Sequence, residues 1–295
     1  MGTKIDRVLV HSMAVKRSVG YLDIFRPHPL LGWSMSPNQE REVSFREGVF
    51  ESIGADGWRR VAGAPAAASS RIAFYGCSFT YGTALRDEET FVSLLQSRLP
   101  DAMMLNRGAG GYGTTQNYLQ FRNDIKNQYI DAAVFCVISD HRYRNYAHPV
   151  WMRRHLLMQW YEIGVEQMPR ARIDRSGKVW IEFIPIWQPS LLRENFDFIF
   201  PDEFTLDRLT IAVLQEIQDV ARTHDIPILI ALLDSVDDPF SAILHEAIPS
   251  ALDISTPYDG EHTFIPHDIH PNVRANEIFA ERLFPHVSSL VSGLR

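Results

Sequence analysis

The stretch RIAFYGCSFTYG (residues 71–82) is the part of the sequence that best indicates how the chain folds and acts. Its first half is a short apolar run that ends in Gly76, which is typical of a buried strand. A turn that carries Ser78 follows and leads toward a helix. Such a turn directs the serine hydroxyl and its backbone N–H into the same space, and so supplies a nucleophile together with one oxyanion donor. The alternative interpretation is that Ser78 only caps the helix.

Downstream of this stretch, apolar runs alternate with segments of helical spacing. Strands are predicted at 71–76, 102–106, 131–139 and 226–234, and helices at 88–99, 114–128, 206–224 and 270–293. This alternation predicts an α/β fold, a three-layer α/β/α sandwich with a mostly parallel sheet. Ligands of such folds bind at the carboxyl ends of the strands, which is where Ser78 is expected.

Two parts of the chain fall outside the alternation. Residues 1–69 are rich in Pro, Gly, Ser and aromatic residues, and they predict a small β-rich extension before a core at 70–295. Residues 142–203 form an aromatic-rich insertion with a predicted hairpin at 170–186, expected over the sheet edge or the rim of the site. Its aromatic side chains either contact substrate or pack in the interior: Trp151, Trp160, Tyr161, Trp180 and Trp187. Its arginines either meet an anionic substrate or form a solvated face: Arg142, Arg144, Arg153 and Arg154.

The composition argues against several classes of protein. The 295 residues include 29 Lys plus Arg and 36 Asp plus Glu, a net charge of −7 without any basic block, so neither nucleic acid nor an anionic membrane is an expected partner. The longest apolar runs, such as IPILIALL (226–233), fall far short of the roughly 20 residues that span a bilayer. Two cysteines cannot build a disulfide framework, and the first residues lack a secretory signal pattern. We therefore expect a cytoplasmic protein.

A second chemical segment, FIPHDIHPN (264–272), stands just before the last predicted helix. A serine nucleophile needs a base of near-neutral pKa, which His270 provides. The base in turn needs an orienting carboxylate, which Asp268 provides. A rival interpretation is a metal site, whose ligands would be His262, His267, Asp268 and His270. Their spacing matches no closed zinc pattern, so no metal is expected.

A third segment, LNRGAGGYGTTQ (105–116), contains Gly108, Gly110 and Gly113 in the spacing of a dinucleotide fingerprint. The segment follows the second predicted strand rather than the first, and no acidic residue ends a strand about twenty positions later. We therefore expect no nucleotide cofactor. The glycines equally suit a loop whose backbone N–H approaches a reacting oxygen.

Four segments together resemble a known family. GCSFTYG (76–82), NRGAGGYGTTQ (106–116), VISDHRYRN (137–145) and HDIHPN (267–272) occur in the order and spacing of the SGNH (GDSL-type) hydrolases, and particularly of their bacterial branch with a GDSFTxG first block. The resemblance covers most of residues 30–290. It implies an SGNH-type fold, no cofactor, Ser78 as the nucleophile, His270 as the base and Asp268 as its orienting residue. It also implies that the N–H groups of Ser78 and Gly111 hold the oxyanion.

The sequence departs from the family pattern at two places. Cys77 stands where the family has Asp, and the third block has Ser139 or Asp140 where the family has an oxyanion-binding Asn. Ser139 and Asn145 are the candidates for the remaining donor, and His141 is another in the right protonation state. Cys77 is expected in packing rather than as a nucleophile.

The sequence therefore predicts a serine esterase that acts through an acyl-enzyme on an O-acyl ester of a sugar or small molecule. One alternative is an acyltransferase with the same triad. Another is a binding module that kept the fold and lost catalysis, which the missing third-block Asn favours.

Overall fold

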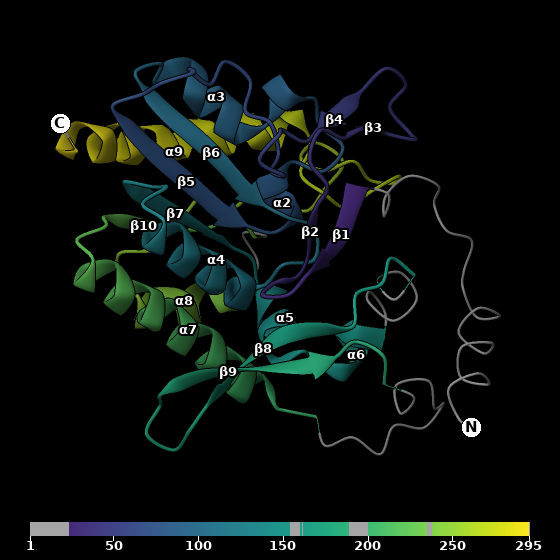
Figure 1. Cartoon of the computed structure of the whole chain (residues 1–295), viewed down its shortest axis with the longest axis vertical. Coiled ribbons are helices and arrows are strands. Elements are labelled where there is room, and N and C mark those ends of the chain that lie inside the picture. The colour runs from purple at the N-terminus through teal and green to yellow at the C-terminus, as the bar shows by residue number, and fades with distance from the viewer. Residues whose placement is uncertain (1–23, 154–159, 161, 189–199, 235–237, 295) are drawn as a thin grey trace.

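The computed structural model describes residues 24–153, 160, 162–188, 200–234 and 238–294. At its centre is a parallel sheet of five strands (Figure 1). These are β5 (Ser70–Gly76), β6 (Ala102–Gly108), β7 (Ala132–Val137), β10 (Ile228–Leu232) and β11 (Leu252–Asp253). Their spatial order is β6–β5–β7–β10–β11, so the strand order reverses between β5 and β7, and this point is where such sheets bind ligands.

Helices cover both faces of the sheet (Figure 1). The helices α3 (Phe91–Arg98) and α9 (Val273–Gly293) lie on one face, and α4 (Thr114–Lys126), α7 (Glu203–Thr223) and α8 (Phe240–Ala247) lie on the other. Along β5, Ile72 and Phe74 join the core under α3 and α9, whereas Ala73 and Tyr75 join the core under α4 and α7. The predicted three-layer α/β/α sandwich is therefore confirmed, because a strand buried on both faces needs a helical layer on each side.

Before the core, the chain forms two small antiparallel pairs. Strand β1 (Phe25–His28) pairs with β2 (Gly32–Met35), and β3 (Glu40–Glu42) pairs with β4 (Phe50–Ser52). The β-rich character predicted for this region is thus confirmed for its described residues, while residues 1–23 lie outside them.

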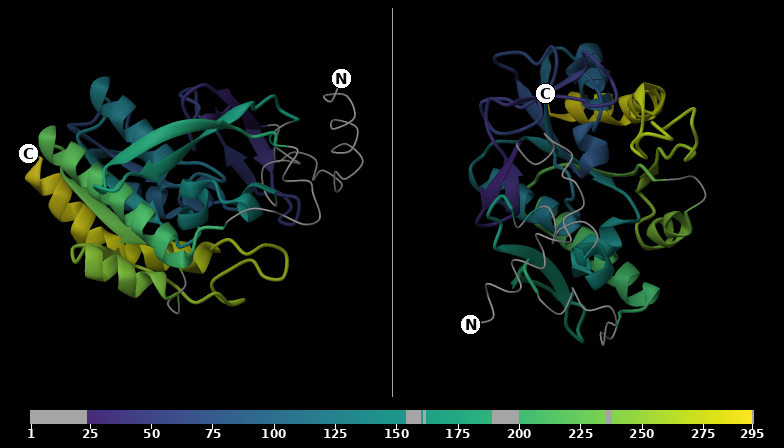
Figure 2. Two further views of the ribbon diagram at one scale, coloured as in Figure 1. Left: turned by 90° about the horizontal axis from the view of Figure 1, so that it is seen from below. Right: turned by 90° about the vertical axis from the view of Figure 1, so that its right-hand side faces the viewer.

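The region after β7 contains α5 (His141–Tyr146), α6 (Pro149–Trp151) and the predicted hairpin. That hairpin forms between β8 (Gln167–Ile173) and β9 (Val179–Pro185), and Gly177 takes a positive φ of 86° in its turn. Strand β8 packs against β2, as both views in Figure 2 agree. The extension and the insertion therefore meet over one side of the core.

The insertion's aromatic side chains mostly pack in the interior. Trp151 and Trp160 are buried in a cluster with Trp33 of β2, whereas Trp180 of β9 is 48% exposed. Tyr161 and Arg154 lie outside the described residues. Among the helices that the structure describes, none is both long and apolar enough to cross a membrane.

Candidate active site

Ser78 lies on a sharp turn between β5 and α2 (Ser78–Tyr81). The turn depends on Gly76, because a Cβ there would lie 1.9 Å from Thr80 Oγ1 and 2.7 Å from Thr80 Cβ. Helix α2 ends at once at Gly82, whose φ of 81° suits glycine. Ser78 consequently stands at the carboxyl end of β5, beside the place where the strand order reverses.

The structure brings Ser78 together with His270 and Asp268. The Nε2 atom of His270 lies 2.7 Å from Ser78 Oγ, and the His270 Nδ1 atom is hydrogen-bonded to Asp268 Oδ1. The backbone N–H of His270 also donates to Asp268 Oδ1, over 2.8 Å. A carboxylate at Nδ1 keeps the proton there, so Nε2 is left to accept the proton of the serine hydroxyl.

The loop that carries this pair is fixed by its own hydrogen bonds. The N–H of Phe264 donates to the carbonyl of His270, and the N–H of Asp268 donates to the carbonyl of Phe264. Two residues after His270, Asn272 caps α9 by accepting from the N–H of Ala275 over 3.2 Å. The base is thus held between a short bridged loop and the start of a long helix.

The carboxyl group of Asp268 is ionised in this arrangement. Burial by itself would raise the pKa of Asp268, but the hydrogen bond and charge of His270, with backbone N–H groups, outweigh burial and hold this pKa below its usual value. The side chains of His270 and Asp268 remain 22% and 26% exposed, so solvent reaches the pair.

Gly111, the second predicted oxyanion donor, lies in the loop after β6. Its φ is 77°, and a Cβ there would lie 3.2 Å from the ring of Trp33, so glycine is required. The same loop packs tightly on α2, since a Cβ on Gly108 would lie 2.4 Å from the backbone N of Tyr81. In the part of the chain that the structure describes, the N–H groups of Ser78 and Gly111 have no hydrogen-bond acceptor.

Ser139 follows β7, the strand next to β5, and is therefore at the same edge of the sheet as Ser78. Its backbone N–H donates to the carboxylate of Asp234, and its carbonyl accepts from Arg142 Nε over 3.0 Å. Its side chain is half-buried. The position of Ser139 leaves it as a candidate third donor.

The structure corrects the expectation for Asn145. This side chain is fully buried, and its Oδ1 accepts from the N–H and the hydroxyl of Thr115, over 2.9 and 3.2 Å. Its Nδ2 donates to Thr210 Oγ1 over 3.1 Å. Asn145 therefore joins α4 to α7, and helix α5 turns it into the interior although it is close to Ser139 in sequence.

His141 is also unsuited to donate as a cation. It is fully buried, and burial together with the charge of Arg144 lowers its pKa well below the ordinary value. Its Nδ1 lies 3.2 Å from Thr114 Oγ1. The ring is therefore neutral at physiological pH.

The arginines of the third block separate rather than form one basic cluster. Arg142 pairs with Glu203 and Asp207 of α7, whereas Arg144 pairs with Asp140 and is only 10% exposed. The Arg144 guanidinium also donates to the carbonyl of Tyr112 over 2.9 Å. The grouping of the arginines in the sequence did not indicate this buried position beside the glycine loop.

The four residues of the rival metal site do not converge on one point. His262 Nδ1 lies 2.7 Å from Asp259, and the His267 ring stacks on Phe45, while Asp268 and His270 bond to each other. Among the described residues, the group with converging ligand atoms is the largely exposed Asp259, Glu261 and His262, which differs from the predicted set.

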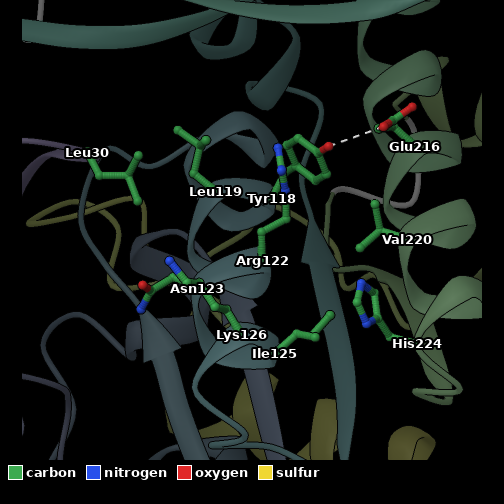
Figure 3. A pocket seen from close by; sticks show the side chains of 10 residues that line it. All are labelled: Leu30, Tyr118, Leu119, Arg122, Asn123, Ile125, Lys126, Glu216, Val220 and His224. Atoms are coloured by element: carbon green, nitrogen blue, oxygen red, sulfur yellow. Dashed lines mark hydrogen bonds between the residues drawn. The ribbon is translucent and has the colours of Figure 1, made fainter.

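A pocket of about 620 Å³ lies apart from the triad, between α4 and α7 (Figure 3). Tyr118 and Glu216, which are hydrogen-bonded across it, mark one end, and Lys126 and His224 line the other. None of the residues that line it belongs to the triad. The chemistry is therefore argued from the triad and not from the volume of this pocket.

Neither the family models nor the curated proteins include a match to this chain. Solved structures of similar fold include an esterase, EstA, of Pseudoalteromonas sp., with 10% identity, a TM-score of 0.44, and coverage of 76% of this chain and 99% of that one. A lipolytic protein of the G-D-S-L family from Veillonella parvula has 12% identity and a TM-score of 0.41, over 74% and 98%. The acetyl xylan esterase AlAXEase has 14% identity and a TM-score of 0.43, over 74% and 99%.

This chain has a three-layer α/β/α fold around a parallel sheet. Its sheet order and the turn that carries Ser78 agree with the fold that the sequence resemblance implied. A fold does not by itself imply a function, so the function depends on the residues of the site.

Proposed function

We propose that this chain is a serine esterase that hydrolyses an O-acyl ester of a sugar or small molecule through an acyl-enzyme. The observation that carries the proposal is the hydrogen-bonded series Ser78–His270–Asp268, with 2.7 Å between Ser78 Oγ and His270 Nε2. A serine, an imidazole and a carboxylate in this order form an activated nucleophile, its base and the residue that orients the base.

In the first half of the reaction, Ser78 Oγ attacks the ester carbonyl carbon while His270 Nε2 takes the hydroxyl proton. The tetrahedral oxyanion is held by the N–H groups of Ser78 and Gly111, each worth about 3 kcal/mol of barrier. The intermediate then expels the alcohol, which receives its proton from His270.

In the second half, His270 deprotonates a water molecule that attacks the acyl group on Ser78, and the carboxylic acid leaves. Asp268 stays ionised and balances the positive charge that His270 acquires twice in the cycle. Transfer to another hydroxyl would use the same groups. The partial exposure of His270 and Asp268 favours hydrolysis, because water reaches the base directly.

Within this proposal, the catalytic unit is the core at 70–295 with its insertion at about 142–203, and residues 1–69 are an extension that supports it. Trp33 of that extension lies against the loop that carries Gly111. The proposal therefore assigns the extension a supporting role at the oxyanion side of the site.

The proposal is tested by labelling the purified chain with a fluorophosphonate, followed by intact mass and peptide mapping. We expect one adduct, on Ser78, and turnover of 4-nitrophenyl acetate that Ser78→Ala abolishes. Ser97→Ala, at an exposed serine on α3, is the matched control and should label as the wild type does. A folded wild-type protein that takes no adduct would refute the esterase and leave the binding module as the better explanation.

A further inference from the structure

The N–H of Gly111 belongs to a peptide unit whose carbonyl is that of Gly110. Trp33 Nε1 donates a hydrogen bond to this Gly110 carbonyl over 2.9 Å. The peptide bond is planar and trans, so its N–H points opposite to its C=O. Whatever fixes the direction of the Gly110 carbonyl therefore fixes the direction of the Gly111 N–H.

Trp33 is itself held firmly in place. The side chain is fully buried, and its ring stacks on Trp160 of the insertion at 4.5 Å between centroids. Its backbone carbonyl accepts the hydroxyl of Tyr112 over 2.5 Å. Trp33 is thus fastened to the glycine loop on either side of Gly111, at Gly110 through its indole and at Tyr112 through its backbone carbonyl.

Arg144 holds the same loop from the other side. Its Nη1 donates to the carbonyl of Tyr112 over 2.9 Å, while its Nε and Nη2 bind Asp140 over 2.8 and 2.6 Å. One rigid fork therefore joins the loops that follow β6 and β7.

The burial of this arginine is costly for stability alone. Its side chain is 10% exposed while that of its partner Asp140 is 44% exposed, so the cation is more deeply buried than the anion that compensates it. A buried ion pair often stabilises a fold less than well-packed apolar residues of similar volume would. The burial of Arg144 is better explained by its hydrogen bonds, which fix the Tyr112 carbonyl relative to Asp140.

We propose that Trp33 and Arg144 are positioning residues of the oxyanion hole, which clamp the glycine loop through the carbonyls before and after Gly111. The inference rests on the proposed esterase function. Neither side chain needs to touch the substrate, because each acts through the backbone that carries the Gly111 N–H.

The test compares Trp33→Phe and Arg144→Lys with two matched controls. Trp58→Phe makes the same change in the same extension, and Arg142→Lys makes the same change in the same helix, away from the glycine loop. The readout is fluorophosphonate labelling of Ser78, which needs no known substrate, measured as the maximal rate and as the reagent concentration at half that rate. Near-ultraviolet circular dichroism checks that each variant is folded.

We expect the two clamp variants, Trp33→Phe and Arg144→Lys, to lose roughly tenfold to a hundredfold in the maximal labelling rate. Loss of a whole oxyanion donor costs more, ~10²–10³-fold, because these variants only misplace the donor. The fluorophosphonate concentration that gives half the maximal rate should stay unchanged. The reagent binds equally well before negative charge develops on its oxygen, and the oxyanion hole acts only on that charge. Affinity for phenylboronic acid, whose tetrahedral adduct resembles the intermediate, should fall by the same factor as the rate. Added guanidinium should partly restore Arg144→Ala.

Wild-type rates in both folded clamp variants would overturn the inference, and so would an equal loss in the two controls. If one clamp variant fails to fold, the other still decides the outcome. A wild-type protein without any label would instead refute the esterase proposal itself, so the two failures are distinguishable.

Discussion

His270 Nε2 lies 2.7 Å from Ser78 Oγ, although the two residues are 192 positions apart in the sequence. The sheet creates this proximity by ending β5 at the turn of Ser78, while the loop before α9 returns His270 to the same edge. The remaining predictions follow from the groups that surround this contact.

Replacing Asp268 by Asn should lower kcat by about a thousandfold or more while the fold is kept. The amide would no longer hold the proton on His270 Nδ1, so Nε2 would carry it and could not accept the serine proton. Steady-state kinetics with 4-nitrophenyl acetate measures the loss. Asp259→Asn, which removes the carboxylate beside His262, is the control and should keep kcat. A kcat within a few-fold of wild type in Asp268→Asn would show that His270 is oriented by another group.

Replacing Ser139 by Ala should lower kcat by roughly tenfold to a hundredfold if its hydroxyl completes the oxyanion hole. This loss is at or below the ~10²–10³-fold that removal of one principal oxyanion donor costs. The position supports this role, since Ser139 follows the strand next to that of Ser78. KM should change little, because the hydroxyl acts only once the oxyanion forms. Unchanged kcat would leave the N–H groups of Ser78 and Gly111 as the complete hole.

Replacing Asn145 by Ala should reduce stability and leave the chemical step intact. The change leaves the Thr115 N–H and the Thr210 hydroxyl unsatisfied in the interior, at a cost of about 2 kcal/mol in the free energy of unfolding. Urea titration measures the stability, and fluorophosphonate labelling measures the reactivity of Ser78. A stable variant that labels slowly would return Asn145 to the oxyanion hole.

The buried His141 predicts a pH dependence of stability. Its pKa is well below the ordinary 6.5 in the folded chain, because burial and Arg144 disfavour its charged form. Below pH 6.5 the unfolded chain binds a proton at this residue and the folded chain does not. The free energy of unfolding should therefore fall with acid, by up to about 1.4 kcal/mol per pH unit, until the folded pKa is reached.

The measurement for His141 is urea unfolding between pH 7.5 and pH 5, with His141→Asn as the test variant. The amide group that this substitution introduces lies near the former position of His141 Nδ1, which faces Thr114. Unlike the imidazole, the amide does not titrate. The variant should show a shallower slope than the wild type, whereas His286→Asn, at an exposed position on α9, should not. Parallel slopes in all three proteins would mean that His141 takes up a proton in the folded chain.

The sequence was sufficient to predict the α/β sandwich and to nominate Ser78, His270 and Asp268, which the structure brings together, because strand ends and short motifs are local features. It missed β11, which has only two residues and no recognisable apolar run. It offered Asn145 as a possible donor because nearness along the chain does not show which way a helix directs a side chain.

No pattern in the sequence predicts Trp33 and Arg144 as supports of the glycine loop. Trp33 reaches Gly110 across 77 positions, and Arg144 reaches Tyr112 across 32. Such contacts depend on how separate elements pack, and a single sequence carries no signal of which distant residues will pair. Asp140 and Arg144 pair at i, i+4 spacing, but no local pattern in the sequence indicates the carbonyl that Arg144 also holds.

The stack of Trp33 on Trp160 connects an extension and an insertion that are remote in the chain. Insertions at the rim of a site are where enzymes commonly acquire new substrate preferences. In this chain, a change that displaced Trp160 would also move the partner that orients Gly110. Adaptation of the insertion to a new ester would therefore alter the rate of the chemical step as well as selectivity, and compensating substitutions should accumulate around Trp33.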